Sequence, residues 1–337
     1  MELENDKNVL KGWADAFIDR DGKFVQEFQT TFDSSFWELY LHAVFKELGM
    51  RCDFQWPSPD FCIGSPEPFT VEATVALHAQ GTAGVTDTTF RDLPGDFNEF
   101  NRQAIVRLSN SVHSKHKKYV ESYSLLPHVM RKPFVLAVAP FDRPHFYLQA
   151  QRAIEALLYR LYVDEEAYLK KYPNRDAPLV GQDLPSVLKD SGESLPLGMF
   201  CDASAAGINA VIQSTAATWS KVRVMSGDPD IMVEAIYENR AEGGQDVFKG
   251  PNSLYEESIL DGLRVYHNPY ATYPLDPALF DRAEIFQASA TGPATLINLS
   301  DSRHILSSRR VTTFASGFME EVLKEMSPTT KFWHHIP

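Results

Sequence analysis

The chain has 337 residues, with 44% hydrophobic and 23% charged side chains, a composition that excludes a disordered or fibrous protein. Its formal net charge of −13 excludes a protein that coats duplex DNA through its overall field, so nucleic acid would have to meet a local basic patch. It lacks the apolar run of about 18 residues that a membrane-spanning helix needs. The three cysteines form no CxxC pair, and we expect a cytoplasmic protein with no membrane partner.

The first clear element is a helix predicted over Phe32–Leu48, which Gly49 follows. Two short extended runs come next, at Asp60–Ile63 and Phe69–Val75. Glycine and proline in the segment between them indicate a turn, so the two runs predict a β-hairpin.

A long loop rich in Gly, Thr and Asp is expected over Leu77–Phe100, followed by a helix over Asn101–Tyr119 with one apolar face. Pro133–Ala139 is a continuous apolar run, typical of a strand covered on both faces. A further helix is predicted over Gln149–Tyr162, and Asp164–Ser194 is expected to be an irregular surface segment.

Later strands are predicted at Met199–Cys201 and Ile208–Ile212. The histidines at His334 and His335 lie at the chain end, where we expect a frayed segment rather than a metal site. The alternation of helices and strands predicts an α/β fold.

The predicted hairpin brings two acids together. With the turn centred on Pro66, Asp60 lies opposite Glu72 and Cys62 opposite Thr70, and opposed residues share one face of the sheet. Like charges opposite each other repel, so a shared proton, a basic neighbour or a divalent cation must offset them. Mg²⁺ prefers one or two carboxylates completed by water and phosphate oxygens. The alternative is a solvated hairpin face on which two acids happen to lie close.

These motifs together resemble the PD-(D/E)xK nuclease superfamily. The resemblance covers about Phe32–Pro140 and lies in Glu38 on the first helix, Pro59-Asp60, and Glu72-Ala73-Thr74 in an apolar strand. It implies a mixed central sheet flanked by helices, binding of Mg²⁺ or Mn²⁺, and hydrolysis of phosphodiester bonds. Asp60 and Glu72 match the two metal-binding acids, and Glu38 matches the additional acid of the first helix. As an alternative, Glu38 pairs with His42 one turn later.

The resemblance also suggests a division of the chain. A restriction-endonuclease-like core is expected over 31–225, preceded by an N-terminal arm over 1–30 and followed by a C-terminal extension over 226–337. No linker in the sequence marks the second boundary.

One residue departs from the family pattern, because Thr74 stands where the motif has its lysine. A threonine hydroxyl cannot supply the positive charge with which that lysine orients water and stabilises developing negative charge. Family members sometimes supply the basic group from the next helix. Here Lys115 is the first candidate substitute and Lys118 the second, while the alternative for both is a solvated helix end, where cations favour the helix dipole.

The same helix carries a local excess of positive charge. Between Asn101 and Val120 there are five cations and no acid: Arg102, Arg107, Lys115, Lys117 and Lys118. We predict that Arg102, Arg107, Lys117 and Lys118 contact the phosphate backbone of a nucleic acid, although a solvated helix face is the alternative. Ser220–Arg223 is a candidate extension of this patch, or else an ordinary amphipathic strand end.

The sequence therefore predicts a metal-dependent endonuclease in which Asp60, Glu72 and Lys115 are catalytic and Glu38 joins the two acids at the cation. We expect DNA or RNA as substrate, cut without sequence specificity or according to structure. By analogy with the family, a role in bacterial antiviral defence, a homodimer and a protein activator are all compatible with this prediction. The first alternative is an inactive nuclease-fold module that binds nucleic acid or a protein. The second is a different hydrolase, active without metal, that uses the acids for acid–base catalysis.

Overall fold

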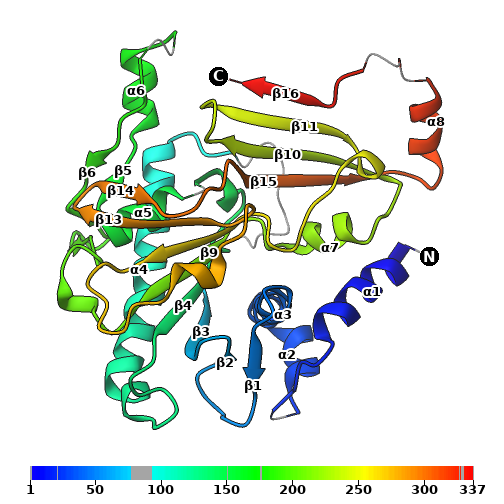
Figure 1. Ribbon diagram of the computed structural model, residues 1–337. Coiled ribbons are helices and arrows are strands. Elements are labelled where there is room, and N and C mark those ends of the chain that lie inside the picture. Colours follow the sequence, from blue (N-terminus) through cyan, green and yellow to red (C-terminus); the bar gives the residue numbers. More distant parts are fainter. Residues whose placement is uncertain are drawn as a thin grey trace.

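The computed structural model describes residues 2–20, 22–76, 93–149, 151–174, 177–325, 327 and 330–336. Within these ranges the protein is a mixed α/β structure with two main sheets, one of eight strands and one of four (Figure 1). None of the helices in these ranges is long and apolar enough to cross a membrane.

The eight-stranded sheet is mixed and has the order β1-β2-β3-β4-β9-β12-β13-β14. Strands β1 to β3 are antiparallel neighbours, β3, β4 and β9 run parallel, β12 is antiparallel to β9 and parallel to β13, and β14 closes the edge antiparallel to β13. The bounds are β1 Arg51–Asp53, β2 Phe61–Ser65, β3 Phe69–Val75, β4 Phe134–Ala139, β9 Ala210–Ser214, β12 Leu263–His267, β13 Phe286–Gly292 and β14 Thr295–Asn298.

The hairpin register predicted from the turn is confirmed. Phe61 pairs with Val71, Cys62 with Thr70 and Ile63 with Phe69. The apolar members of these pairs are buried in the core that contains α3 (Phe32–Glu47). The hairpin therefore has one face fixed against α3.

Helices cover both faces of the strand β4, as its continuous apolar sequence predicts. Val135, Ala137 and Ala139 lie in the core with α3, where the Trp37 indole donates a hydrogen bond of 3.1 Å to the Ala137 carbonyl. The alternate residues Phe134, Leu136 and Val138 lie in a second core with α4 (Phe97–Glu121) and α5 (Arg152–Tyr159). All six residues of the strand are buried.

The second sheet is antiparallel and has the order β15-β10-β11-β16. Its strands are β10 Ile231–Asn239, β11 Gln245–Pro251, β15 His304–Thr313 and β16 Trp333–Ile336. The prediction of a frayed chain end is wrong, because His334 and His335 lie in β16 opposite Val247 and Asp246. The backbone pairing and a contact of 2.8 Å between His335 Nδ1 and Asp246 Oδ1 hold this strand.

Several predicted boundaries change. Residues 77–92 of the predicted long loop lie outside the described residues, and Phe97–Phe100 belongs to α4, where the Asp96 side chain accepts a hydrogen bond from the Glu99 amide. The predicted strand at Met199–Cys201 is wrong, since these residues form a turn. The predicted irregular segment Asp164–Ser194 contains short elements.

The remaining helices and strands are α1 Glu2–Ala14, α2 Phe24–Thr30, α6 Glu165–Lys171, α7 Trp219–Met225, α8 Phe318–Glu325, β5 Leu161–Tyr162, β6 Gln182–Asp183, β7 Ser186–Leu188 and β8 Ser194–Pro196.

Helix α1 and strand β12, from the two outer parts of the predicted division, both contact the central part. Trp13 of α1 is buried against Phe36 and Tyr40 of α3, and Asp6 forms an ion pair with Arg223 of α7. The pairing of β12 with β9 carries the large sheet across residue 225. The division into an arm, a core and an extension stays a prediction, and these contacts join the three parts.

The two-sided burial of β4 predicts a strong dependence of stability on its side chains. Leu136→Ala removes a side chain that is 0% exposed and should lower the free energy of unfolding by about 2–5 kcal/mol, because the second core loses contacts and keeps a cavity. Leu188→Ala is the matched control: this side chain of β7 is 58% exposed, and its loss should change stability by no more than about 0.5 kcal/mol. Urea unfolding followed by circular dichroism measures both. Equal losses would contradict the assignment of β4 to the core.

Candidate active site

Asp60 stands at the point where the ladder between β2 and β3 ends. Its Oδ2 accepts a hydrogen bond of 2.7 Å from the Ala73 amide. The amides of Thr70 and Ala76 donate to Pro133 and Ala139 on the side of β4, so the odd-numbered amide of Ala73 faces the side of β2. The Asp60 carboxylate therefore takes the place of a backbone acceptor and is fixed to β3 next to Glu72.

Glu72 is a buried carboxylate, with 1% of the residue exposed. Its Oε1 accepts hydrogen bonds from Lys115 Nζ at 2.7 Å and from Lys118 Nζ at 3.0 Å. Its Oε2 is also buried and makes no hydrogen bond of normal geometry within the described residues. A buried charge is costly unless it is paired, so the two ammonium groups are what allow Glu72 to lie here.

The topology explains why both lysines reach Glu72. Parallel strands such as β3 and β4 need a crossover, and α4 provides it over the face on which Glu72 and its neighbour Leu136 lie. Lys115 and Lys118 are three residues apart and so share one side of the helix. The structure places the first and the second candidate for the missing motif lysine on the same carboxylate oxygen.

Tyr123 also faces this carboxylate. It follows α4 directly and is 4% exposed, and the Lys118 ammonium lies 4.6 Å from the centre of its ring. Burial and the charge of Glu72 both raise the pKa of the Tyr123 phenol, which therefore stays protonated as a hydrogen-bond donor at neutral pH.

The other two acids titrate well above their ordinary range. Burial, followed by the charge of Glu72, raises the pKa of Asp60 to about 6, against the Ala73 amide, Lys115 and Arg20, which lower it. Burial and the charge of Asp60 raise the pKa of Glu38 to about 8. Glu38 thus lies close enough to Asp60 for the charge of that carboxylate to raise its pKa.

The three acids do not form a ready-made ligand set. Across the described ranges, no three His, Cys, Asp or Glu side chains come together closely enough to hold a metal ion. The predicted set of Asp60, Glu72 and Glu38 is therefore not assembled. Two carboxylates are nevertheless sufficient for Mg²⁺, which takes water for its remaining positions. The buried carboxylate of Glu72 and the neighbouring carboxylate of Asp60 are the two groups that would supply oxygen ligands to such a site.

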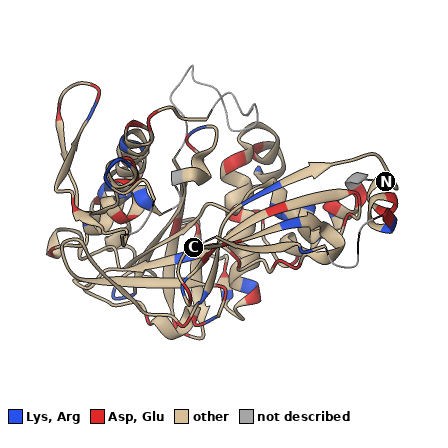
Figure 2. Cartoon of the chain, turned by 90° about the horizontal axis from the view of Figure 1, so that it is seen from above, with Lys and Arg blue, Asp and Glu red and all other residues tan. Residues whose placement is uncertain are grey.

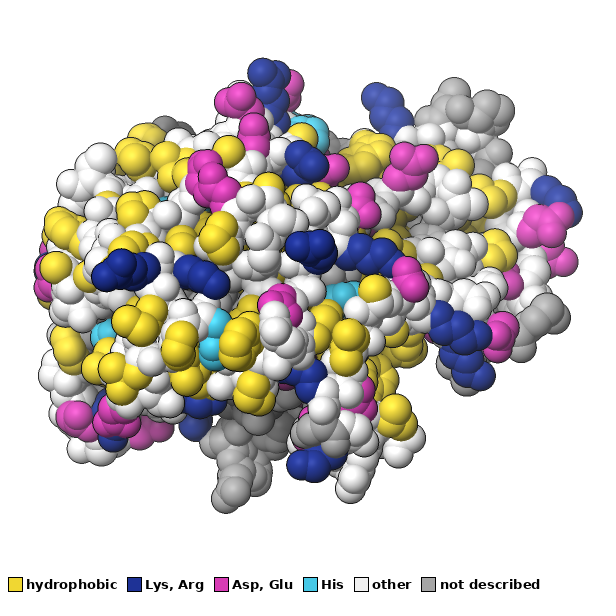
Figure 3. Space-filling model, turned by 60° about the horizontal axis from the view of Figure 1, so that its bottom comes forward, with side chains coloured by type: hydrophobic (Ala, Val, Ile, Leu, Met, Phe, Trp, Pro, Cys, Tyr) yellow, Lys and Arg dark blue, Asp and Glu magenta, His cyan; other side chains and the backbone are white. Residues whose placement is uncertain are grey.

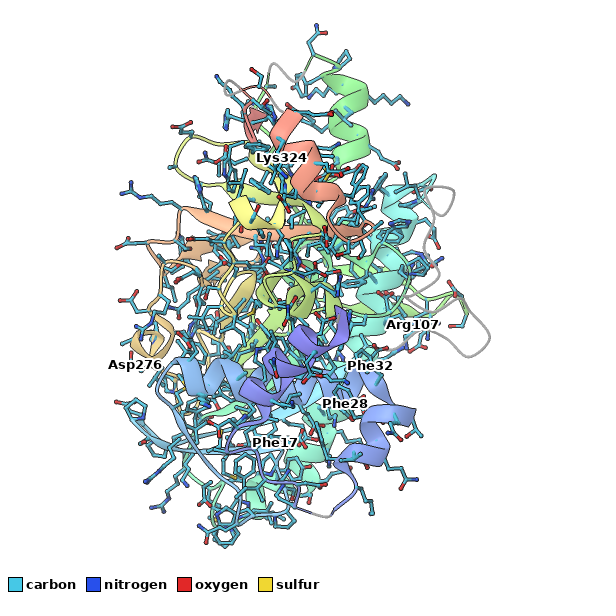
Figure 4. All side chains as sticks on the ribbon, turned by 90° about the vertical axis from the view of Figure 1, so that its right-hand side faces the viewer. Phe17, Phe28, Phe32, Arg107, Asp276 and Lys324 are labelled. Carbon is cyan, nitrogen blue, oxygen red and sulfur yellow. The ribbon has the colours of Figure 1, made fainter. Side chains whose placement is uncertain are left out.

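The predicted basic patch is only partly available to a partner. Arg102 is bound by Glu99 and by Asp190 at 2.7 and 2.6 Å. Lys117 is 73% exposed and lies 3.7 Å from Glu121. Arg107 is half-buried on α4, where Figure 4 labels it.

The segment Ser220–Arg223 does not extend this patch. It belongs to α7, and its cations are buried in ion pairs, Lys221 with Glu257 at 2.6 Å and Arg223 with Asp228 at 2.7 Å. Acidic and basic residues are interspersed over the described parts of the chain (Figure 2), and on the face that Figure 3 shows, basic side chains form small groups separated by hydrophobic, uncharged and acidic ones. A continuous basic surface is not seen there.

Two residues near the acids are not predicted from the sequence. Tyr123 lies beyond the end of the predicted helix, and Arg20 lies far upstream in the N-terminal arm. Neither belongs to a motif, and no periodicity points to them. Arg20 bonds to the segment just before Asp60, through hydrogen bonds to the carbonyls of Trp56 and Pro59.

In comparisons with known proteins, no family model, no curated protein and no solved structure matches this chain significantly. The resemblance to PD-(D/E)xK nucleases therefore stays a prediction from the sequence.

The raised pKa of Glu38 predicts a pH-dependent stability. Between its ordinary pKa of 4.5 and its folded pKa of about 8, the folded protein binds more protons than the unfolded chain, so the free energy of unfolding falls as pH rises through this window. Glu38→Gln cannot ionise, and its melting temperature should rise relative to that of the wild type from about pH 4.5 to about pH 8. Glu47→Gln changes an exposed glutamate of the same helix and should show no such trend. A constant difference across the window would exclude this account of Glu38.

Proposed function

We propose that this protein is a divalent-metal-dependent nuclease of the PD-(D/E)xK type that hydrolyses phosphodiester bonds in DNA or RNA. The observation that carries the proposal is the hydrogen bond of 2.7 Å from Lys115 to Glu72, across 43 residues of sequence. It brings a lysine to the acid of the motif although the motif position itself holds Thr74. The succession of α3, the β2–β3 hairpin, α4 and β4 supports a restriction-endonuclease-like core.

Asp60 and Glu72 would hold Mg²⁺ or Mn²⁺. Such an ion, when bound, activates water and neutralises negative charge on a phosphodiester. The chain itself positions Asp60 through the Ala73 amide and Glu72 through the rigid strand β3. Carboxylates held in this way lose little conformational freedom when a cation binds, which favours binding.

Lys115 is the proposed catalytic cation. Its side chain is 25% exposed, so the ammonium group lies between the buried carboxylate and solvent, where a substrate phosphate would approach. A fixed positive charge at that point stabilises the negative charge that develops during phosphodiester hydrolysis. Lys118, at 48% exposed, and Tyr123 add a second cation and a neutral donor around the same carboxylate.

The dispersed charges favour cutting that is nonspecific or depends on the structure of the nucleic acid. Direct sequence reading needs side chains presented to base edges by an element that fits a groove. Of the predicted contact residues, Arg102 is held by two acids, whereas Lys117 and Lys118 stay exposed at the end of α4. These lysines suit phosphate contacts, which carry no sequence information.

The second candidate function is an inactive module that binds nucleic acid or a protein. Thr74 and the unassembled three-acid set favour it. In that case the lysines serve only to neutralise Glu72. Binding of Mn²⁺ without cleavage of any nucleic acid would support the module over the nuclease.

Replacing either acid should abolish cleavage without unfolding the protein. Asp60→Ala and Glu72→Gln each remove a proposed ligand, so cleavage of a panel of single- and double-stranded DNA and RNA in Mn²⁺ should fall to background. Calorimetric titration should show the loss of Mn²⁺ binding. Glu67→Gln, an exposed acid in the turn of the same hairpin, is the control and should leave both unchanged. Activity that survives a chelator would refute metal dependence.

Lys115→Ala should lower kcat by about 100-fold or more, because it removes a charge that acts in the transition state, while Mn²⁺ affinity changes little. Lys117→Ala removes an exposed lysine from the same turn of α4 that is assigned only to phosphate contact, so it is a control for kcat, which should stay unchanged even where KM rises. Lys118→Ala tests the second candidate in the same assay. A rise in KM with unchanged kcat for Lys115→Ala would reduce its role to substrate binding.

A further inference from the structure

The segment that leads into Asp60 has no strand partner of its own. β1 ends at Asp53 and β2 begins at Phe61, and the residues between them form bends. Backbone carbonyl groups in such a segment need hydrogen-bond donors from elsewhere if they are to be fixed in place. Asp60 can be held precisely only if this segment is.

Two side chains from distant parts of the chain provide these partners. Arg20 Nη1 donates to the Trp56 carbonyl at 2.5 Å and to the Pro59 carbonyl at 3.3 Å. His128 Nε2 lies 2.7 Å from the Ser58 carbonyl, and its ring stacks on Trp56 with centroids 4.2 Å apart. The bond to Pro59 is made to the residue directly before Asp60.

The N-terminal arm is itself anchored at this place. The Phe17 ring lies 4.7 Å from that of Phe24, 5.3 Å from His42 of α3 and 5.7 Å from Phe54. Figure 4 labels Phe17 and Phe28 on the N-terminal segments. Since Phe17 packs on Phe54 and Arg20 bonds to Trp56, the arm reaches the loop through an apolar and a polar contact three residues apart.

We propose that Arg20 is a positioning residue of the site, which fixes the segment Trp56–Pro59 and through it the carboxylate of Asp60. The planar guanidinium carries several N–H groups in a fixed geometry, and here one nitrogen joins two carbonyls that flank a turn. The hydrogen bond from Ala73 to Asp60 then depends on an arginine about 40 residues upstream. The N-terminal arm becomes part of the site in this way.

The Ala73 amide offers a readout that is independent of catalysis. If Arg20 holds Asp60 in place, Arg20→Gln should speed hydrogen exchange of the Ala73 amide by about tenfold or more in the metal-free protein, because its acceptor is no longer fixed. The Val138 amide of β4 should keep its exchange rate. Arg51→Gln is the matched control: this exposed arginine of β1 pairs with Ser65, beside the hairpin turn, at the end of β2 opposite to Asp60.

Metal affinity is the second readout, and this part rests on the proposed function. Loss of a residue that orients a ligand typically weakens metal binding by about 10–100-fold, so Arg20→Gln should raise the calorimetric Kd for Mn²⁺ by at least about tenfold. Arg20→Lys keeps the charge and N–H donors and should recover part of both effects. It also serves as the folded variant if Arg20→Gln unfolds.

The outcomes separate the two proposals. An unchanged Ala73 exchange rate in Arg20→Gln overturns the positioning role, whatever happens to Mn²⁺ binding. Faster exchange together with weaker Mn²⁺ binding supports it. Faster exchange in a protein whose wild type binds no Mn²⁺ supports the positioning role and overturns the proposed nuclease.

Discussion

The buried charge of Glu72 is the constraint on which the rest of the site depends. A carboxylate that is 1% exposed is stable only with partners, and the chain supplies two ammonium groups at hydrogen-bond distance. Those partners come from α4 because parallel strands β3 and β4 require a crossover, and this crossover packs on the face that Glu72 shares with Leu136. The topology of the sheet therefore also determines which side chains balance the charge of Glu72.

The features that could be predicted from the sequence are local. A turn rich in proline and glycine with alternating neighbours determined the hairpin register, and with it the closeness of Asp60 and Glu72. The apolar run of β4 predicted burial on both faces, which its two cores confirm. In each case the period of the side chains or the chemistry of the turn acts within a few residues.

The features that could not be predicted depend on partners far away in sequence. The positions of β16 and α7 are determined by pairing with β11 and by buried ion pairs, which a composition or a short pattern does not reveal. Counting charges along α4 likewise overestimated its free positive charge. Arg102 pairs with Asp190, and Lys115 and Lys118 pair with Glu72, so three of the five cations are bound to acids of other elements.

The structure suggests a physical reason why position 74 holds threonine and not the lysine of the family motif. Alternation along β3 places it on the same face as Glu72, about 7 Å further along the strand. Lys115 and Lys118 already bring two positive charges to that face, against Glu72 and the neighbouring Asp60. A third ammonium at position 74 would add repulsion in a half-buried place, where like charges are costly. Under the proposed function, α4 supplies the basic group that the family motif has on the strand. Because Lys115 and Lys118 already provide the positive charge, a small neutral side chain such as Thr74 suits the motif position.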